Sequence, residues 1–224
     1  MNPLVIGLII IGILLQGLFI KVEHEEKYVL ADILKGSAAL MFVLVGYNAY
    51  LANSSDTNRL FLIGLIFGMI GDILLNLRYV FPKNGQKIFL VGILAFLIGH
   101  ILYLVALIPS AQHLWIFVAL GAIAAAGLLA YIFKTMEVKK AFKIFGVFYL
   151  GAVFIMCSIA IGIAIFAPSP RSIVYAIGAI LFTASDVVLI FNTFSGVTRF
   201  SLRITNLSLY YLGQMLIACS MFLQ

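Results

Sequence analysis

The chain has 224 residues, of which 64% are hydrophobic and 10% charged, and its formal net charge is +6. Soluble domains average roughly 45–50% apolar and 25% charged residues, so this composition excludes a soluble globular protein and indicates an integral membrane protein. Cys157 and Cys219 both fall in apolar segments, where a free thiol packs as a small hydrophobic group, so they predict neither a disulfide framework nor a metal motif.

Eight apolar segments are long enough to cross about 30 Å of hydrocarbon, which takes about 20 helical residues. The first lacks a basic leading region and a small-residue cleavage site, so we interpret it as a retained span. No room remains for a soluble domain, and we expect an all-α polytopic protein with a single membrane-embedded domain over residues 1–224. The predicted spans are 3–20, 31–51, 60–77, 88–108, 114–133, 141–166, 172–191 and 206–223.

Basic residues concentrate in alternate connections between these spans. Eleven lie in the odd-numbered connections and two, Arg59 and Arg171, in the even-numbered ones, while Lys35 lies within the second span. The positive-inside rule therefore predicts cytoplasmic odd connections and outward termini, and we expect the location to be the plasma (inner) membrane of a bacterium. The positive net charge then reflects topology and contact with anionic lipid, and no nucleic-acid partner is expected.

The second half of the chain resembles the first at an offset of 114 positions. This shift places the first four spans on the second four, and the clearest local match aligns residues 64–72 with residues 178–186. Four helices return the chain to its starting side, so the two halves should have the same orientation in the membrane. We therefore predict a 4+4 parallel internal repeat, with halves of approximately 1–110 and 115–224 related by an axis along the membrane normal. Elsewhere the residue identity is weak, so chance similarity between apolar helices is the alternative.

Two aspartates interrupt corresponding apolar spans. Asp72 and Asp186 each precede another polar residue, His100 or Gln214, by the same distance, since 100 − 72 and 214 − 186 are both 28. An ionisable group in hydrocarbon costs at least ~2.5–3.5 kcal/mol, which makes each aspartate a candidate functional residue. Both lie roughly 9 Å from the inner end of their spans at 1.5 Å per residue. The pattern predicts a duplicated polar site within the membrane.

Other polar side chains are expected at a similar depth. Gly64, Gly68, Asp72 and Asn76 repeat every four residues, so this helix face should pack inside the bundle, where small residues allow close approach. We therefore predict a polar chamber in the cytoplasmic half of the membrane. Its candidate lining residues are Lys35, Asp72, Asn76, His100, Tyr103, Asp186, Tyr210 and Gln214.

Several of these residues also have a structural interpretation. Lys35 either contacts an anionic substrate group or pairs with Asp32, three positions earlier on the same helix face. Four others can be hydrogen-bonding contacts between helices, namely His100, Tyr103, Tyr210 and Gln214. The aspartates favour a functional interpretation more strongly, because two charged groups at matched depth cannot both be interfacial.

Five local motifs follow one another along the chain. They are Lys35 in the second span, Gly71-Asp72, Gly92-x3-Phe96-x2-Gly99-His100-x2-Tyr103, Ser185-Asp186 and Tyr210-x2-Gly213-Gln214. In this combination the whole transmembrane chain resembles the YhhN/TMEM86 family of lysoplasmalogenases. It departs from the usual family pattern where Gly36 replaces the proline after Lys35 and where Gly213 replaces the alanine before Gln214.

The resemblance implies hydrolysis of the sn-1 vinyl ether bond of lysoplasmenyl-ethanolamine or lysoplasmenyl-choline, giving a fatty aldehyde and a glycerophospho-alcohol. Vinyl ethers hydrolyse by protonation of the β-carbon, which gives an oxocarbenium ion that water captures. One carboxyl must therefore be protonated and another ionised, which fits Asp72 and Asp186 as the catalytic pair. The role of each is open, because a coupled pair titrates as a unit. The expected partners are the lysophospholipid substrate and bilayer lipids, and the scheme needs no cofactor or metal.

Other classes of membrane protein fit the sequence less well. A zinc site needs at least three protein ligands, and of the histidines only His100 lies in a span. The Gly-x-Gly-Asp signature of intramembrane aspartyl proteases fails at residues 69–72, and no Gly-x-Ser-x-Gly motif occurs. The main alternative is a proton-coupled transporter or lipid-binding protein with an intramembrane aspartate pair, although neither half has an obvious proline-broken helix at the site.

Overall fold

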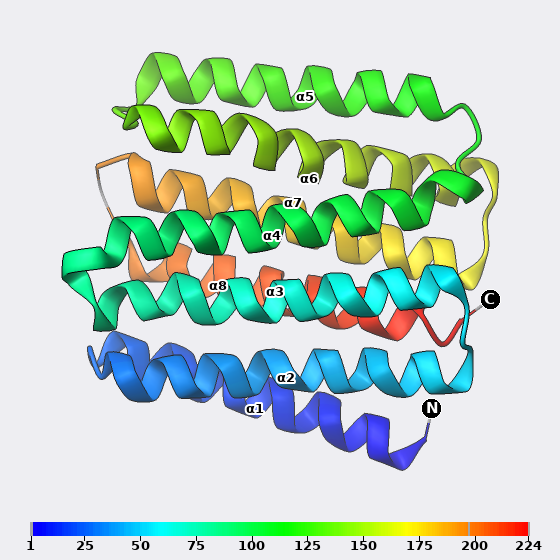
Figure 1. Ribbon diagram of the computed structural model, residues 1–224, viewed down its shortest axis with the longest axis horizontal. Helices are drawn as coiled ribbons and strands as arrows, with labels where there is room; N and C mark the ends of the chain where they lie inside the picture. The colour runs from blue at the N-terminus through cyan, green and yellow to red at the C-terminus, as the bar shows by residue number, and fades with distance from the viewer. Residues whose placement is uncertain (1, 197, 224) are drawn as a thin grey trace.

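The computed structural model describes residues 2–196 and 198–223, and within them the fold is a bundle of eight long α-helices with no β-strand (Figure 1). This confirms the all-α prediction, and most helix ends lie within a few residues of the ends of the predicted spans. The helices are α1 (Pro3–His24), α2 (Tyr28–Ala52), α3 (Asp56–Val80), α4 (Gly85–Leu107), α5 (Leu114–Thr135), α6 (Lys140–Phe166), α7 (Pro170–Phe194) and α8 (Phe200–Ser220). Short 3-10 turns, η1 (Pro82–Asn84) and η2 (Ile108–Ser110), flank α4.

Local sequence explains several helix starts. The Ser55 side chain accepts a hydrogen bond from the backbone N–H of Asn58 (3.2 Å) at the start of α3. At the start of α7, Ser169 and Ser172 bond to each other's backbone N–H groups in a capping box, and Pro170 occupies the first turn. These side chains satisfy backbone donors that a helix leaves free at its N-terminus.

Seven of the helices in the described part of the chain, α1 to α7, are long and apolar enough to cross a membrane, as expected of an integral membrane protein. The predicted eighth span is a helix but does not reach this level of hydropathy, because α8 contains polar residues such as Arg203, Asn206 and Gln214. α8 runs along α7 and also contacts α1, α2 and α3 inside the bundle. Its neighbours therefore surround much of its polar surface.

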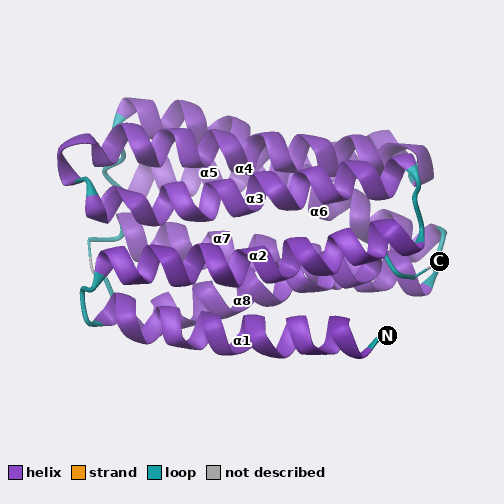
Figure 2. Ribbon diagram, turned by 60° about the horizontal axis from the view of Figure 1, so that its bottom comes forward, coloured by secondary structure: helices purple, strands orange, loops and turns teal. Residues whose placement is uncertain are grey.

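Consecutive helices run antiparallel, and the most extensive packing joins α3 to α4 and α7 to α8. α5 lies at one edge against α6, while α4 contacts α6 and α2 contacts α8 across the bundle (Figure 1). Both termini lie at one end of the bundle in both views (Figure 2). The connections α1–α2, α3–α4, α5–α6 and α7–α8 lie at the other end, and the helix ends beside them carry most of the Lys and Arg residues.

Glycines allow close helix approach at two corresponding places. A Cβ atom added at Gly99 would lie 3.0 Å from the carbonyl oxygen of Gly64, and one added at Gly213 would lie 2.8 Å from that of Gly178. The pairs Gly64–Gly99 and Gly178–Gly213 are related by the predicted offset of 114 positions. They hold α3 against α4 and α7 against α8 in the same way. The full 4+4 repeat stays a prediction.

Candidate active site

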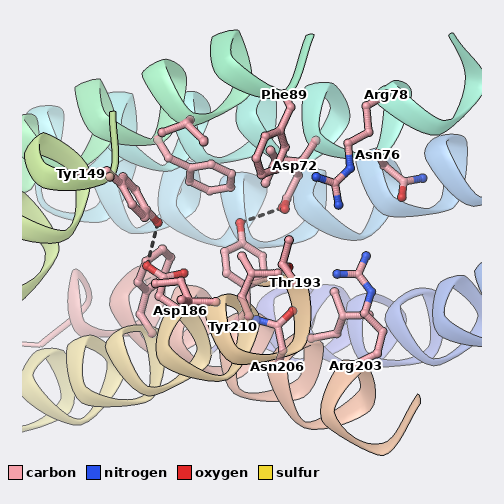
Figure 3. A pocket seen from close by; sticks show the side chains of 18 of the residues that line it. Asp72, Asn76, Arg78, Phe89, Tyr149, Asp186, Thr193, Arg203, Asn206 and Tyr210 are labelled. Carbon is pink, nitrogen blue, oxygen red and sulfur yellow. Dashed lines mark hydrogen bonds between the residues drawn. The ribbon is translucent and has the colours of Figure 1, made fainter. Parts of the chain in front are cut away.

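A cavity of about 130 Å³ lies between the helices (Figure 3), and its lining residues belong to the half of the bundle that is remote from the termini in Figure 1. Asp72 on α3 and Asp186 on α7 both line it, together with Lys35, Asn76 and Tyr210. Most of the other lining residues are apolar or aromatic. They include Phe19, Leu75, Phe89, Ile93, Phe96, Phe142, Tyr149, Leu150, Phe182, Leu189, Ile190, Phe194 and Leu207. Five of the eight predicted site residues thus share one cavity.

Asp72 has both a cationic and a hydroxyl partner. Its Oδ1 atom lies 3.1 Å from Nζ of Lys35, and Tyr210 donates a hydrogen bond of 2.7 Å to Oδ2. The Lys35 ammonium also lies 4.4 Å from the centre of the Tyr210 ring. Lys35 and Asp72 are 5% and 3% exposed, so the ammonium compensates a negative charge on Asp72 in a site that excludes solvent.

Asp186 has a neutral partner. Its Oδ2 atom accepts a hydrogen bond of 2.7 Å from the hydroxyl of Tyr149 on α6 (Figure 3). Asp186 is 4% exposed and forms no ion pair within the described residues. A charge on this carboxyl group would therefore be buried without a counter-ion, which is costly.

The different partners occupy corresponding positions in the two halves. Tyr149 follows Lys35 by 114 positions, which is also the separation of Asp72 and Asp186. At one aspartate the preceding helix thus supplies an ammonium group, and at the other it supplies a phenol. Tyr149 was not among the predicted site residues, although applying the offset to Lys35 would have found it.

The structure contradicts one interpretation of Lys35. The salt bridge of Lys35 is with Asp72, not with Asp32 as one alternative proposed. Oδ1 of Asp32 is buried and has no hydrogen-bond partner among the described residues. The long lysine side chain extends inward from α2 and reaches the carboxyl group of Asp72 on the neighbouring helix α3.

Arg203 also lines the cavity, although the predicted spans placed it in a connecting loop. α8 begins at Phe200 and not at residue 206, so Arg203 lies within the helix. Its Nε and Nη2 atoms donate hydrogen bonds of 2.9 and 2.6 Å to the carboxylate of Glu23 on α1. The spacing of Arg203, Asn206 and Tyr210 corresponds to one helix face, and this periodicity could have identified it.

Asn76 belongs to the same network. In the orientation that satisfies both amide atoms, its nitrogen donates to Oε1 of Glu23 (3.0 Å) and its oxygen accepts from the backbone N–H of Asp32 (3.1 Å). Asn76 is therefore a link between α1, α2 and α3 at the wall of the cavity.

Three predicted residues lie outside the cavity lining, in a buried layer beside it. Tyr103 donates a hydrogen bond of 3.2 Å to Oε1 of Gln214. Nδ1 of His100 lies 2.7 Å from the carbonyl oxygen of Phe96, and its Nε2 atom is buried with no hydrogen-bond partner in the described residues. The His100 ring packs on Phe182, which does line the cavity, at a centroid distance of 4.6 Å. These side chains join helices behind the cavity.

Among the described residues, no group of three or more His, Cys, Asp and Glu side chains is arranged to hold a metal ion. The acid–base groups of the cavity are the two aspartates and the hydroxyl groups bonded to them. This arrangement suits proton transfer inside a mostly apolar cavity.

The model of the YhhN family matches residues 32–221. The chain belongs to the YhhN family. The match extends from α2 to the end of α8, so the YhhN region contains both aspartates and Lys35, whereas Glu23 on α1 precedes it. The comparison with curated proteins and the comparison with solved structures each gave no match.

Proposed function

We propose that this YhhN protein is a lysoplasmalogenase, a hydrolase that cleaves the sn-1 vinyl ether bond of lysoplasmenyl lipids to a fatty aldehyde and a glycerophospho-alcohol. The observation that carries the proposal is the unequal partnering of two carboxyl groups in one cavity. Asp72 has a counter-ion in Lys35, whereas Asp186 has the hydroxyl of Tyr149. The site thereby favours one ionised and one protonated carboxyl, the pair that vinyl ether hydrolysis requires.

The first step is proton transfer to carbon. Protonated Asp186 gives its proton to the β-carbon of the vinyl ether, and the resulting oxocarbenium ion is stabilised by nearby negative charge. Water then attacks the carbon attached to oxygen and loses a proton to Asp72. The product of these steps is a hemiacetal, with Asp186 ionised and Asp72 protonated.

Collapse of the hemiacetal restores both groups. The hemiacetal hydroxyl gives its proton to Asp186, and Asp72 gives its proton to the departing glycerol oxygen as the carbon–oxygen bond breaks. The net reaction is addition of one water across the vinyl ether and release of aldehyde and alcohol. Asp186 is again protonated and Asp72 again faces Lys35, so the cycle needs no other proton donor.

The cavity lining suits a substrate with a long hydrocarbon chain. Phe89, Phe96, Phe142 and Phe182 surround the aspartates with apolar surface. An alkenyl chain that enters from the bilayer would exchange contacts with lipid for contacts with this apolar lining. We place the lysophospholipid in this cavity with its vinyl ether near Asp186.

The proposed topology puts the mouth of the cavity on the cytoplasmic side. We place the mouth at the end rich in Lys and Arg, where Arg78 and Arg203 line the cavity, and positive residues favour the cytoplasmic side. Single cysteines at positions 84 and 138 should therefore react with a reagent from the cytoplasmic side, and one at position 55 from the outside. The reverse pattern would overturn the orientation.

The experiment that tests the function is aldehyde release from purified protein given lysoplasmenyl-ethanolamine, with the saturated alkyl-ether analogue as control. We expect aldehyde from the vinyl ether and none from the alkyl ether. In D2O the aldehyde should contain one deuterium on the carbon next to the carbonyl, because that carbon receives the proton from the enzyme. Absence of cleavage, together with proton-coupled uptake into vesicles, would instead support the transporter alternative.

A further inference from the structure

A second cavity adjoins the mouth of the first. The two share the lining residues Arg78, Leu189, Thr193 and Arg203, and the outer one adds Arg199. Arginine side chains thus lie where the apolar chamber opens toward the end of the bundle. In Figure 3, Arg78 from α3 and Arg203 from α8 point toward each other across this opening.

Arg78 is held in place without a carboxylate partner among the described residues. Its guanidinium carbon lies 4.2 Å from the centre of the Phe89 ring and 4.6 Å from that of Tyr79. Nη2 donates a hydrogen bond of 2.7 Å to the Tyr79 hydroxyl, while Nε is buried and has no hydrogen-bond partner among the described residues. No ion pair of Arg78 occurs in that part of the chain either. The aromatic rings orient a positive charge that remains available to an anion.

The two other cations that line the apolar cavity are already engaged, and Arg199 lines only the outer one. Arg203 is paired through two nitrogen atoms with Glu23, and Lys35 is paired with Asp72. An anionic substrate group would have to displace a carboxylate to bind Lys35 directly. At Arg78 it meets an uncompensated guanidinium, whose planar donors match the oxygen atoms of a phosphate.

We propose that Arg78 binds the phosphate of the lysophospholipid at the mouth of the cavity, with Arg203 contributing positive charge beside it. This proposal rests on the proposed hydrolase function. It assigns to Arg78 the contact with an anionic substrate group that the sequence suggested for Lys35. Arg78 follows Asp72 by six residues, about 9 Å along α3 at 1.5 Å per residue. The glycerol unit between the vinyl ether and the phosphate, together with the length of the arginine side chain, can bridge that separation.

The test compares a charged-head substrate with a headless one. For Arg78→Gln, we expect kcat/KM for lysoplasmenyl-ethanolamine to fall at least about tenfold, mainly through KM, and kcat/KM for 1-alkenylglycerol to change less than about twofold. Arg78→Lys keeps the charge but loses the planar donors, so its loss should be intermediate. Arg59→Gln is the matched control, because Arg59 lies at the opposite end of α3 in an exposed pair with Asp56 and should leave both substrates unchanged.

A binding measurement separates this inference from the hydrolase function. The saturated alkyl-ether lysophospholipid should bind the wild type more tightly than Arg78→Gln by a similar factor, whether or not the wild type cleaves vinyl ethers. The headless alkylglycerol should bind both equally, and inorganic phosphate should compete only weakly, because the apolar chamber contributes to lipid binding. Equal loss for charged and headless ligands, or no loss for either, would overturn the phosphate site even if aldehyde release is observed. Equal binding by Arg78→Gln and Arg78→Lys in folded protein would also contradict it.

Discussion

Asp72 and Asp186 lie at corresponding positions on α3 and α7, line the same cavity and are almost equally buried, yet their neighbours differ in charge. α2 gives Asp72 an ammonium partner, while α6 gives Asp186 a phenol. Each carboxyl also accepts a hydrogen bond of 2.7 Å from a tyrosine hydroxyl, so the direct contact that distinguishes them is the one with the lysine. Under the proposed mechanism, lysine at position 35 and tyrosine at position 149 favour different protonation states for two identical side chains.

Under the proposed mechanism, this comparison explains how two carboxyl groups at corresponding positions can act as an acid–base pair. A symmetric pair with two lysines would favour two ionised carboxylates and supply no acid, while a pair with two tyrosines would leave any negative charge uncompensated. The mixed arrangement favours one protonated and one ionised carboxyl, as carboxyl pairs in other acid–base enzymes require. Asymmetry at positions 35 and 149 is thus the feature on which the mechanism depends.

The largest expected effect is on turnover when either carboxyl is made a neutral amide. Asp72→Asn and Asp186→Asn should each lower kcat/KM by about 10²–10⁴, because general acid–base catalysis contributes on that scale. Aldehyde release by the purified variants measures the loss, and thermal unfolding in detergent checks that they remain folded. Near-normal turnover by either variant would show that the pair does not share the catalytic work.

The next effect concerns stability and separates the two sides. Lys35→Met leaves Asp72 without a counter-ion, so we expect it to lower the free energy of unfolding by roughly 3–5 kcal/mol. Adding Asp72→Asn in the same chain should recover most of that loss, because it removes the uncompensated charge. A double variant as unstable as Lys35→Met alone would mean that the lysine stabilises the bundle by packing and not by charge.

A smaller effect should distinguish the tyrosines. Tyr149→Phe removes the hydrogen bond that Asp186 accepts among the described residues. We expect it to lower kcat about tenfold, which corresponds to a loss of about 1.4 kcal/mol in transition-state stabilisation. Tyr210→Phe should cost less, because Lys35 still orients Asp72. The measurement is kcat and KM for both variants. The unequal roles would be in doubt if Tyr210→Phe lowered kcat more than Tyr149→Phe.

Much of the fold could be predicted from the sequence, because apolar segments of sufficient length have few alternatives in a membrane. The limits of α3 and α7 follow from Ser55, Ser169 and the flanking prolines and polar residues. α8 was the exception. Its polar side chains face other helices, so hydropathy alone placed its start too late and left Arg203 in a loop.

The sequence predicts the site residues that are charged groups within apolar segments. It does not predict which group each long side chain contacts. Asp72 and Asp186 stand out in any apolar segment, and they do share a cavity. The partner of Lys35 depends on the packing of α2 against α3, which local spacing cannot reveal. His100 and Gln214 follow Asp72 and Asp186 by the same 28 residues, but both side chains are buried outside the cavity lining, which sequence spacing alone does not reveal.

Infrared difference spectroscopy of the purified protein tests the central claim, that Asp186 holds a proton while Asp72 is ionised. A buried protonated carboxyl gives a carbonyl band distinct from the carboxylate bands, and aspartate-to-asparagine substitution assigns it. At neutral pH the wild type should show this band, Asp186→Asn should lose it, and Asp72→Asn should retain it while losing a carboxylate band. Loss of the protonated band in Asp72→Asn and its retention in Asp186→Asn would contradict the account.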